Sequence, residues 1–236
     1  MNTYSYGTKT IEYDVQKSAR KTISISVEPK KPVIIKVPKQ MTDTEIEEAI
    51  AKKAYWIVQQ QFLMKDIQVE KYQRDYVNGE CFLYLGRSYT LQLEMSDDTK
   101  IPIVKLYQGK LVVVTNTKDP VILKAAIVRW YREKAQEIIE RRIKYYEALF
   151  DKKRGRIIIK EQQKRWGSCS KTGDLMINWR IVMAQPSVID YVIVHELCHL
   201  IHHNHSSEFW NEVARVLPNY ENSKNWLMNN GIELEL

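Results

Sequence analysis

The hydrophobic pattern of residues 1–118 is mainly that of β-strands. Apolar and polar residues alternate in "TIEYDV", "TISISV" and "VIIKV", and prolines stand near the ends of these runs. Two later pairs of apolar runs flank the dipeptides at 86–87 and 108–109, and both dipeptides contain a glycine, which predicts two hairpins. We therefore expect a strand-rich amino-terminal region, residues 1–118.

Two helices are predicted in the first 150 residues. Apolar residues recur at helical spacing over residues 41–65, and Thr42 with Glu45 fits a capping box at the start of this segment. A longer amphipathic pattern runs from residue 119 to about residue 150. The second helix is expected to connect the strand-rich region to the remainder of the chain.

The last ninety residues show short strands followed by helices. The segments "RIIIK", "KRWGSCS" and "LMINWR" have strand patterns, and a glycine-containing turn separates the last two. Pro186 then opens a strongly apolar helix with Asp190 at a capping-box position, and Ser206 is a good N-cap for a further helix. The expected fold is α+β, with regions 1–118 and 119–236 that form two domains or one continuous domain, and a small antiparallel sheet in the second region.

The composition is that of an ordinary globular protein. The chain has 236 residues, of which 44% are hydrophobic and 28% are charged. Its amino terminus lacks the apolar core of a signal peptide, and no apolar run approaches the roughly 18 residues of a membrane span. The three cysteines are few and widely spaced, so we expect a protein of the reducing cytoplasm without a membrane partner.

The chain is basic, and this suggests a second class of function. The formal net charge is +7, and a small cluster of cations occurs at Lys152, Lys153, Arg154 and Arg156. A basic surface attracts nucleic acid or acidic proteins. An adaptor that binds such a partner, with a structural or vestigial metal site, is therefore the alternative to an enzyme.

All five histidines lie between residues 195 and 205, and two of them frame a glutamate in an H-E-x-x-H motif. His195 and His199 are separated by about one helical turn, so both imidazoles can bind one ion, and neutral imidazole suits zinc. Glu196 lies about 100° further round the helix. It is poorly placed as a ligand but well placed to take a proton from a water molecule on the metal.

A catalytic zinc ion needs a third protein ligand. His203 would lie about 12 Å along a continuous helix from His195, so the chain must turn back before it can add a ligand. Asn204 tolerates the left-handed conformation that ends helices, and such a turn would bring His205 to the metal. Later carboxylates remain alternatives to His205, namely Glu208 and Glu212. His202 and His203 are expected to be exposed polar residues near the helix end.

The residues around "KRWGSCS" are candidates for substrate binding. An edge strand beside the metal helix can pair with an extended substrate, and the small residues Gly167 and Ser168 would let a backbone approach. Trp166 could line the cleft or belong to the core. By proximity in the sequence, three further residues are candidates to stabilise charge in the transition state: Arg165, Arg180 and Tyr191.

The segments "RWGSCS", "INWR", "VIDYVIVHELCHL" and "NHSSEFW" together resemble the YgjP-like metal-dependent hydrolases, which are relatives of the SprT-like zinc metallopeptidases. The resemblance implies a zincin-like metallopeptidase unit with one Zn²⁺ per chain, bound by His195, His199 and His205, and Glu196 as the catalytic carboxylate. It implies a peptide or protein substrate, although the motif also fits hydrolysis of a non-peptide amide.

Overall fold

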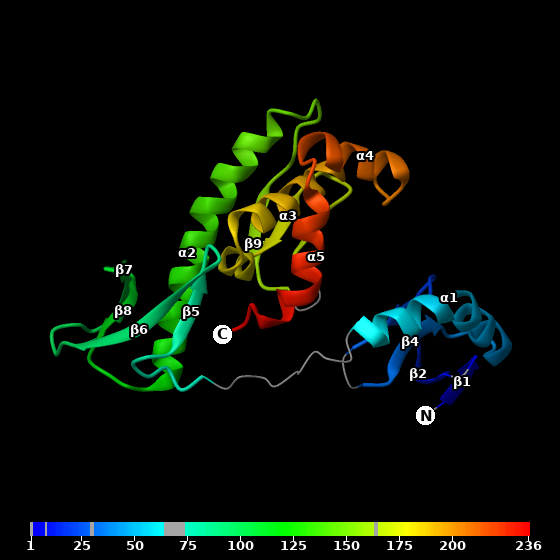
Figure 1. The fold of residues 1–236 in the computed structure, drawn as a ribbon, viewed down its shortest axis with the longest axis horizontal. Helices are drawn as coiled ribbons and strands as arrows, with labels where there is room; N and C mark the ends of the chain where they lie inside the picture. The colour runs from blue at the N-terminus through cyan, green and yellow to red at the C-terminus, as the bar shows by residue number, and fades with distance from the viewer. Residues whose placement is uncertain (1, 8, 29–30, 64–73, 163–164) are drawn as a thin grey trace. The chain divides into compact units, whose positions relative to one another are not determined.

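The computed structural model describes residues 2–7, 9–28, 31–63, 74–162 and 165–236. Figure 1 shows a mixed α and β chain with several small sheets. Its contacts divide it into two compact units, Met1–Tyr72 and Gln73–Leu236. These bounds differ from the regions 1–118 and 119–236 suggested by the hydrophobic pattern.

The first unit is a four-stranded sheet with one helix. Its elements are β1 (Asn2–Tyr6), β2 (Lys9–Ser18), β3 (Ser24–Ser26), β4 (Val33–Pro38) and α1 (Asp43–Leu63). The strand order is β1-β2-β4-β3, and β2 and β4 are parallel. Alternate residues of β4, such as Ile35, are buried against Ile46 and Ile50 of α1. The apolar alternation thus gives one buried face, as expected, whereas β1 had no signal of its own in the pattern.

The predicted capping box at the start of α1 is confirmed. The backbone N–H of Thr42 donates to Oε2 of Glu45 at 2.8 Å, and the backbone N–H of Glu45 donates back to Oγ1 of Thr42 at 3.4 Å. The helix is described as far as Leu63, and residues 64 and 65, which the pattern assigned to it, lie outside the described residues.

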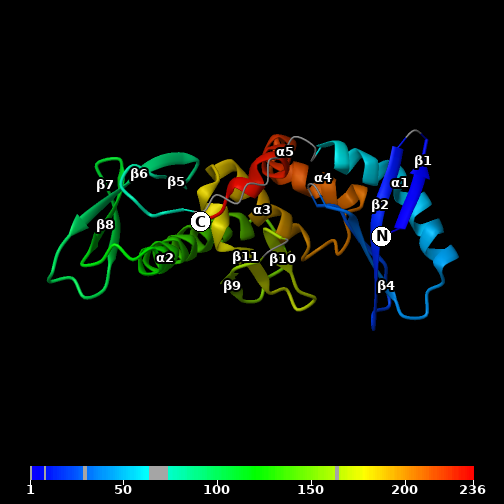
Figure 2. The same ribbon diagram turned by 90° about the horizontal axis from the view of Figure 1, so that it is seen from below.

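The second unit begins with a hairpin sheet and a long helix. The elements are β5 (Cys81–Tyr84), β6 (Arg87–Met95), β7 (Ile103–Tyr107), β8 (Lys110–Thr115) and α2 (Pro120–Glu147). Both predicted hairpins are present, and the first turns at Leu85-Gly86, where φ is 51° and 76°. Figure 2 shows this sheet at one end of α2. Leu91 and Leu111 share a core with Leu123 and Ile127 of α2, so the sheet and the helix belong to the same unit.

The remaining elements of the second unit surround a buried helix. They are β9 (Ile157–Lys160), β10 (Gly167–Cys169), β11 (Leu175–Asn178), the 3₁₀ helix η1 (Trp179–Met183), α3 (Pro186–Cys198), α4 (Ser207–Val216), α5 (Tyr220–Asn230) and the 3₁₀ helix η2 (Gly231–Glu233). The sheet order is β10-β11-β9, with β10 antiparallel and β9 parallel to β11. The expectation of an antiparallel sheet is therefore confirmed for β10 and β11 but wrong for β9, because the pattern of a strand does not specify its partners. β10 lies at the edge of this sheet and contacts α3.

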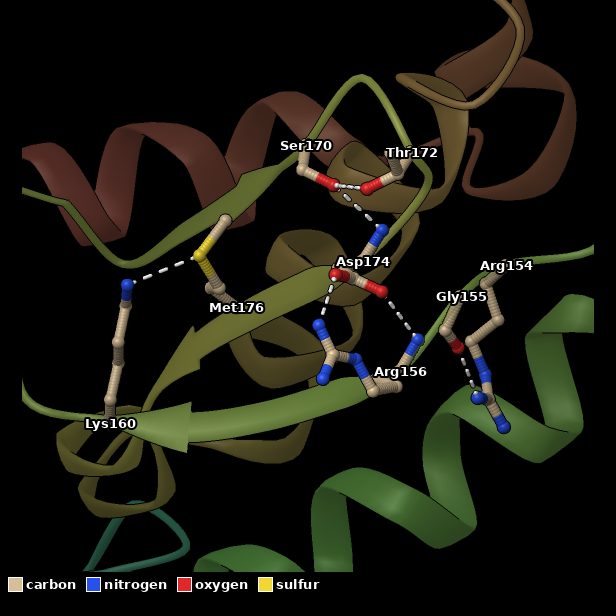
Figure 3. Close-up of polar contacts among 8 residues, drawn as sticks. All are labelled: Arg154, Gly155, Arg156, Lys160, Ser170, Thr172, Asp174 and Met176. Carbon is tan, nitrogen blue, oxygen red and sulfur yellow. Dashed lines mark hydrogen bonds and ion pairs between the residues drawn. The ribbon is translucent and has the colours of Figure 1, made fainter.

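The turn between β10 and β11 is held by side chains (Figure 3). Asp174 accepts hydrogen bonds from the backbone N–H of Arg156 at 2.8 Å and from its guanidinium at 3.1 Å. The hydroxyl of Ser170 accepts from the backbone N–H of Asp174 at 2.9 Å and bonds the hydroxyl of Thr172. These bonds fix the position of β10, and β10 in turn contacts the metal-motif helix.

Helix α3 is buried on most sides, as its apolar sequence predicts. Ten of its thirteen residues are buried, among them Asp190 and Glu196. The expected capping role of Asp190 is wrong, because Gln185 is the N-cap and makes no side-chain cap bond. Asp190 instead lies 3.3 Å from the guanidinium of Arg142, and this ion pair ties α3 to α2. No helix in the described ranges is long and apolar enough to cross a membrane.

Candidate metal centre

Three histidines converge at the carboxyl end of α3. His195 lies in the last turn of the helix, His199 is its C-cap, and His205 belongs to the loop before α4. One ring nitrogen from each forms a set whose members all lie within 4.8 Å of one another. Nε2 of His195 and Nε2 of His205 are 3.0 Å apart. Two ring nitrogens this close can share one proton or one metal ion.

The chain turns back just before His205, as the sequence suggested, but without a left-handed residue. After α3 ends at Cys198, the backbone N–H groups of Ile201 and His202 both donate to the carbonyl of Cys198, which closes the helix end. Among the described non-glycine residues, positive φ occurs at Tyr76, Leu85 and Gln108, so the predicted left-handed conformation of Asn204 is wrong. A bend at residues 203–204 then carries His205 back to the other two rings.

The main chain of His202 orients a neighbouring imidazole. Nδ1 of His199 lies 2.9 Å from the carbonyl oxygen of His202. A carbonyl can only accept, so Nδ1 carries the proton and Nε2 keeps its lone pair. The His202 ring is half-buried and His203 is exposed, and neither belongs to the convergent set.

Burial and nearby cations favour the neutral form of His195 and of His205. Burial lowers the pKa of His195 to about 3, with smaller contributions from the charges of His199, His205 and Lys224. Burial also lowers the pKa of His205, again assisted by His199 and Lys224. Nδ1 of His195 is buried without a hydrogen-bond partner. Three convergent imidazole nitrogens fit the donor preference of Zn²⁺.

Glu196 is a buried carboxyl group beside this cluster. Glu196 is only 4% exposed, and its Oε2 has no hydrogen-bond partner. Burial raises the pKa of Glu196 to about 8, opposed by the charge of Arg165 and by a hydrogen bond from the backbone N–H of Cys169. A group with such a pKa can both accept and return a proton near neutral pH.

Gly167 allows β10 to contact this carboxyl group. A Cβ atom at Gly167 would lie 2.6 Å from Oε1 of Glu196 and 2.7 Å from its Cγ. A larger residue at 167 would therefore displace Glu196. The sequence suggested that a small residue here lets a substrate backbone approach. The structure adds a second explanation, because only a glycine fits against Glu196.

One edge of β10 is turned away from the sheet. The backbone N–H of Asn178 donates to the carbonyl of Trp166 at 2.8 Å, and the N–H of Ser170 donates to the carbonyl of Asp174 at 2.9 Å. Bonding residues alternate along an antiparallel strand, so the backbone groups of Gly167 and Cys169 face the other way. The N–H of Cys169 is used by Glu196. The backbone of Gly167 is thus oriented to pair with an added strand.

The other sequence candidates lie in different surroundings. Arg165 is exposed, and its charge acts on Glu196. The indole of Trp166 is half-buried and packs beside Gly231. Arg180 forms an ion pair with Glu161 at 2.8 Å. The Tyr191 ring lies 5.8 Å from the His195 ring, and burial raises its pKa.

Aromatic rings from α4 and α5 enclose the histidines. The Phe209 ring lies 4.6–4.9 Å from the rings of all three histidines. Trp210 stacks on His205 at 5.7 Å and on Tyr220 at 5.4 Å. No pattern in the sequence pointed to Tyr220 or Lys224, because only the packing of α5 on α3 brings them near the cluster.

The two alternative carboxylate ligands are engaged elsewhere. Glu208 is exposed, and hydrogen bonds from the side chain of Ser206 and from its own backbone lower its pKa. Glu212 lies 2.7 Å from the guanidinium of Arg215. Neither belongs to the convergent set, whereas His205 does.

Comparison with known proteins identifies the family of this chain. The model of the YgjP-like metallopeptidase domain matches residues 21–230. Two similar solved structures are the metallopeptidase zymogens of Pyrococcus abyssi abylysin (22% identity, 39% of this chain, 93% of that chain, TM-score 0.36) and of Methanocaldococcus jannaschii jannalysin (25% identity, 42% and 90%, TM-score 0.31). No curated protein gave a significant match. Because the family model spans most of the chain, this protein belongs to the YgjP-like family and carries its metallopeptidase domain.

Proposed function

We propose that this protein is a zinc-dependent peptidase in which Glu196 is the general base. The observation that carries the proposal is the convergence of three imidazoles, with one ring nitrogen from each within 4.8 Å of the others, beside a buried carboxyl group with an unbonded oxygen. Buried polar atoms without a partner are costly, and they persist where a ligand or a reaction uses them. Membership of a metallopeptidase family supports the same function.

His195, His199 and His205 would hold one Zn²⁺ ion through ring nitrogens. When bound, this metal would supply the Lewis acid that makes a water molecule reactive and polarises a substrate carbonyl. The hydrogen bond from His199 to the carbonyl of His202 fixes one of these rings, and the Phe209 ring packs against all three. These contacts would orient the rings for a metal ion.

Glu196 would move the proton during hydrolysis. Its carboxylate accepts a proton from the attacking water, and the resulting carboxylic acid donates that proton to the leaving amine. Arg165 favours the ionised form of Glu196, and the backbone N–H of Cys169 holds the carboxylate in place. Burial favours the protonated form, so the two states are close in free energy.

The edge of β10 would bind an extended peptide. The backbone of Gly167 faces away from β11 and can exchange hydrogen bonds with a substrate strand, whereas the backbone of Ser168 faces β11. Arg165 is the preferred sequence candidate for contact with the substrate, because it is exposed beside Glu196. Arg180 is a weaker candidate, because Glu161 already neutralises it.

The basic-adaptor alternative has less support. Two of the four cations in its cluster are paired with acids, since Arg154 lies 2.7 Å from Glu147 and Arg156 lies 3.1 Å from Asp174. Exposed pairs of this kind reduce the positive field that would attract nucleic acid.

Two substitutions test the proposed function. Glu196→Gln should keep zinc but lower peptide hydrolysis by a factor on the order of 10²–10⁴. His199→Ala should lose zinc itself. Metal content and cleavage of a fluorogenic peptide set would be measured, with exposed His203→Ala as the control. Undiminished hydrolysis in Glu196→Gln would refute the role of Glu196, and stoichiometric zinc in His199→Ala would refute its role as a ligand.

A further inference from the structure

Lys224 lies beside the histidine cluster, although no pattern in the sequence pointed to it. Lys224 belongs to α5, one helical turn after Tyr220. Its Nζ lies 4.0 Å from the centroid of the Trp210 ring, and this ring stacks on His205 and lies 5.8 Å from the His195 ring. The contact with the indole holds the ammonium group by a cation–π interaction.

The charge of Lys224 lies near the metal-binding rings. Its ammonium group lies over the Trp210 ring, and that ring packs against both His195 and His205. Within the described part of the chain, Lys224 makes no ion pair with a carboxylate. Other cations of this unit do, for example Arg142 with Asp190 and Arg215 with Glu212.

An unpaired ammonium group beside a cation site is unfavourable without an anion. The residue is only half-exposed, so water screens its charge less than at an open surface. A metal ion on the three histidines would repel it, and an anionic group bound near both would be attracted to both. A negatively charged ligand that contacts both Lys224 and the metal would therefore be favoured.

We propose that Lys224 binds an anionic oxygen of the substrate next to the histidine cluster. The proposal rests on the proposed function, because it takes the three histidines as the metal site. The same chemistry has two possible sources. One is the carbonyl oxygen that gains negative charge as water adds to it, and the other is the free carboxylate at the end of a short peptide.

The test uses the full-length zinc-loaded protein and three probes in calorimetric titrations. The first probe is acetyl-trialanine with a free carboxylate, the second is the same peptide as its neutral amide, and the third is a terminally blocked phosphinic peptide with a tetrahedral anion. The variants are Lys224→Met and Lys224→Arg. Lys144→Met is the matched control, because Lys144 is an exposed lysine of α2 and its loss changes the net charge equally.

Lys224→Met should bind at least one anionic probe about tenfold more weakly, which is the usual value of a hydrogen bond to a charged group. Weaker binding of the phosphinic peptide identifies the tetrahedral oxygen, and weaker binding of the free acid identifies the terminal carboxylate. Lys224→Arg and Lys144→Met should bind as the parent protein does. The neutral amide should be unaffected in every variant.

Zinc affinity separates this role from a structural one. The zinc affinity of Lys224→Met, measured by chelator competition, should equal or exceed that of the parent protein, because a positive charge has been removed. Equal affinity of the parent protein and Lys224→Met for both anionic probes would overturn the proposal while the proposed function stands. A parallel loss of zinc and of the neutral amide would also overturn it, since Lys224 would then only support the fold. A parent protein without zinc affinity would overturn both proposals.

Discussion

The sheet-and-helix core of the first unit differs in polar content from the surroundings of α3 in the second unit. Within the described residues, the first core contains only apolar side chains and one tyrosine, such as Ile35 and Ile50. All five buried polar or charged residues of the described part of the chain lie in the second unit, and they include Asp190 and Glu196 on the same helix. A core that only stabilises a fold avoids such groups, so their presence supports the proposal that the second unit carries the reactive site.

Chelation should produce the largest difference between the two regions. Zinc held by the three histidines at a free concentration 1,000 times its dissociation constant would stabilise the second unit by about 4 kcal/mol. A chelator should therefore lower the protection of α3 and α4 amides from hydrogen exchange and leave α1 unchanged. Equal loss of protection in both units would contradict the assignment of the metal to α3 alone.

A cavity in the first core should change stability but not chemistry. Ile50 is fully buried against the sheet, so Ile50→Ala should cost about 2–5 kcal/mol of unfolding free energy. Urea unfolding would measure this cost, with Ile50→Val as the smaller matched change. Zinc affinity should remain that of the parent protein, and a lower affinity would show that the first unit contributes to the site.

A methyl group at residue 167 should disturb the site more than the fold. The Cβ atom of Gly167→Ala would lie 2.6 Å from Oε1 of Glu196. A displacement of about 1 Å at a reacting group costs about 100-fold in rate, while the overpacking costs about 1–3 kcal/mol. Peptide cleavage and urea unfolding would be measured together, with Ser168→Ala as the neighbour that adds no atom. Normal cleavage by Gly167→Ala would show that Glu196 tolerates the displacement.

Loss of the ring behind His205 should have the smallest of these effects. Trp210→Leu removes the stacking surface of His205, and changes around a metal ligand weaken metal binding by about tenfold at the low end. Trp226→Leu on α5 is the matched control, because its ring makes no contact with the three histidines in the described structure. Chelator competition would measure both. Equal zinc affinity of the two variants would remove Trp210 from any role in positioning His205.

Local features were predictable where short-range physics fixes them. The capping box of Thr42 and Glu45, the two glycine hairpins and the buried face of β4 all depend on residues a few positions apart. Predictions that depended on distant partners were less successful. Asp190 has the residue type and spacing of a cap, yet it pairs with Arg142 of α2. Hydrogen bonds to the carbonyl of Cys198 close the end of α3, and the bend at residues 203–204 forms without a left-handed Asn204.

The sequence by itself determined the motif, because His195, Glu196 and His199 lie within five residues and helix geometry alone sets their relative directions. It also limited the third ligand to three candidates. Only the tertiary structure brought His205 to the other rings and left Glu208 and Glu212 outside the set. The contacts of Gly167 with Glu196 and of Lys224 with Trp210 also depend on packing between different elements of the chain. No local pattern encodes such contacts, since they form only when α3, α5 and the edge strand β10 share one core.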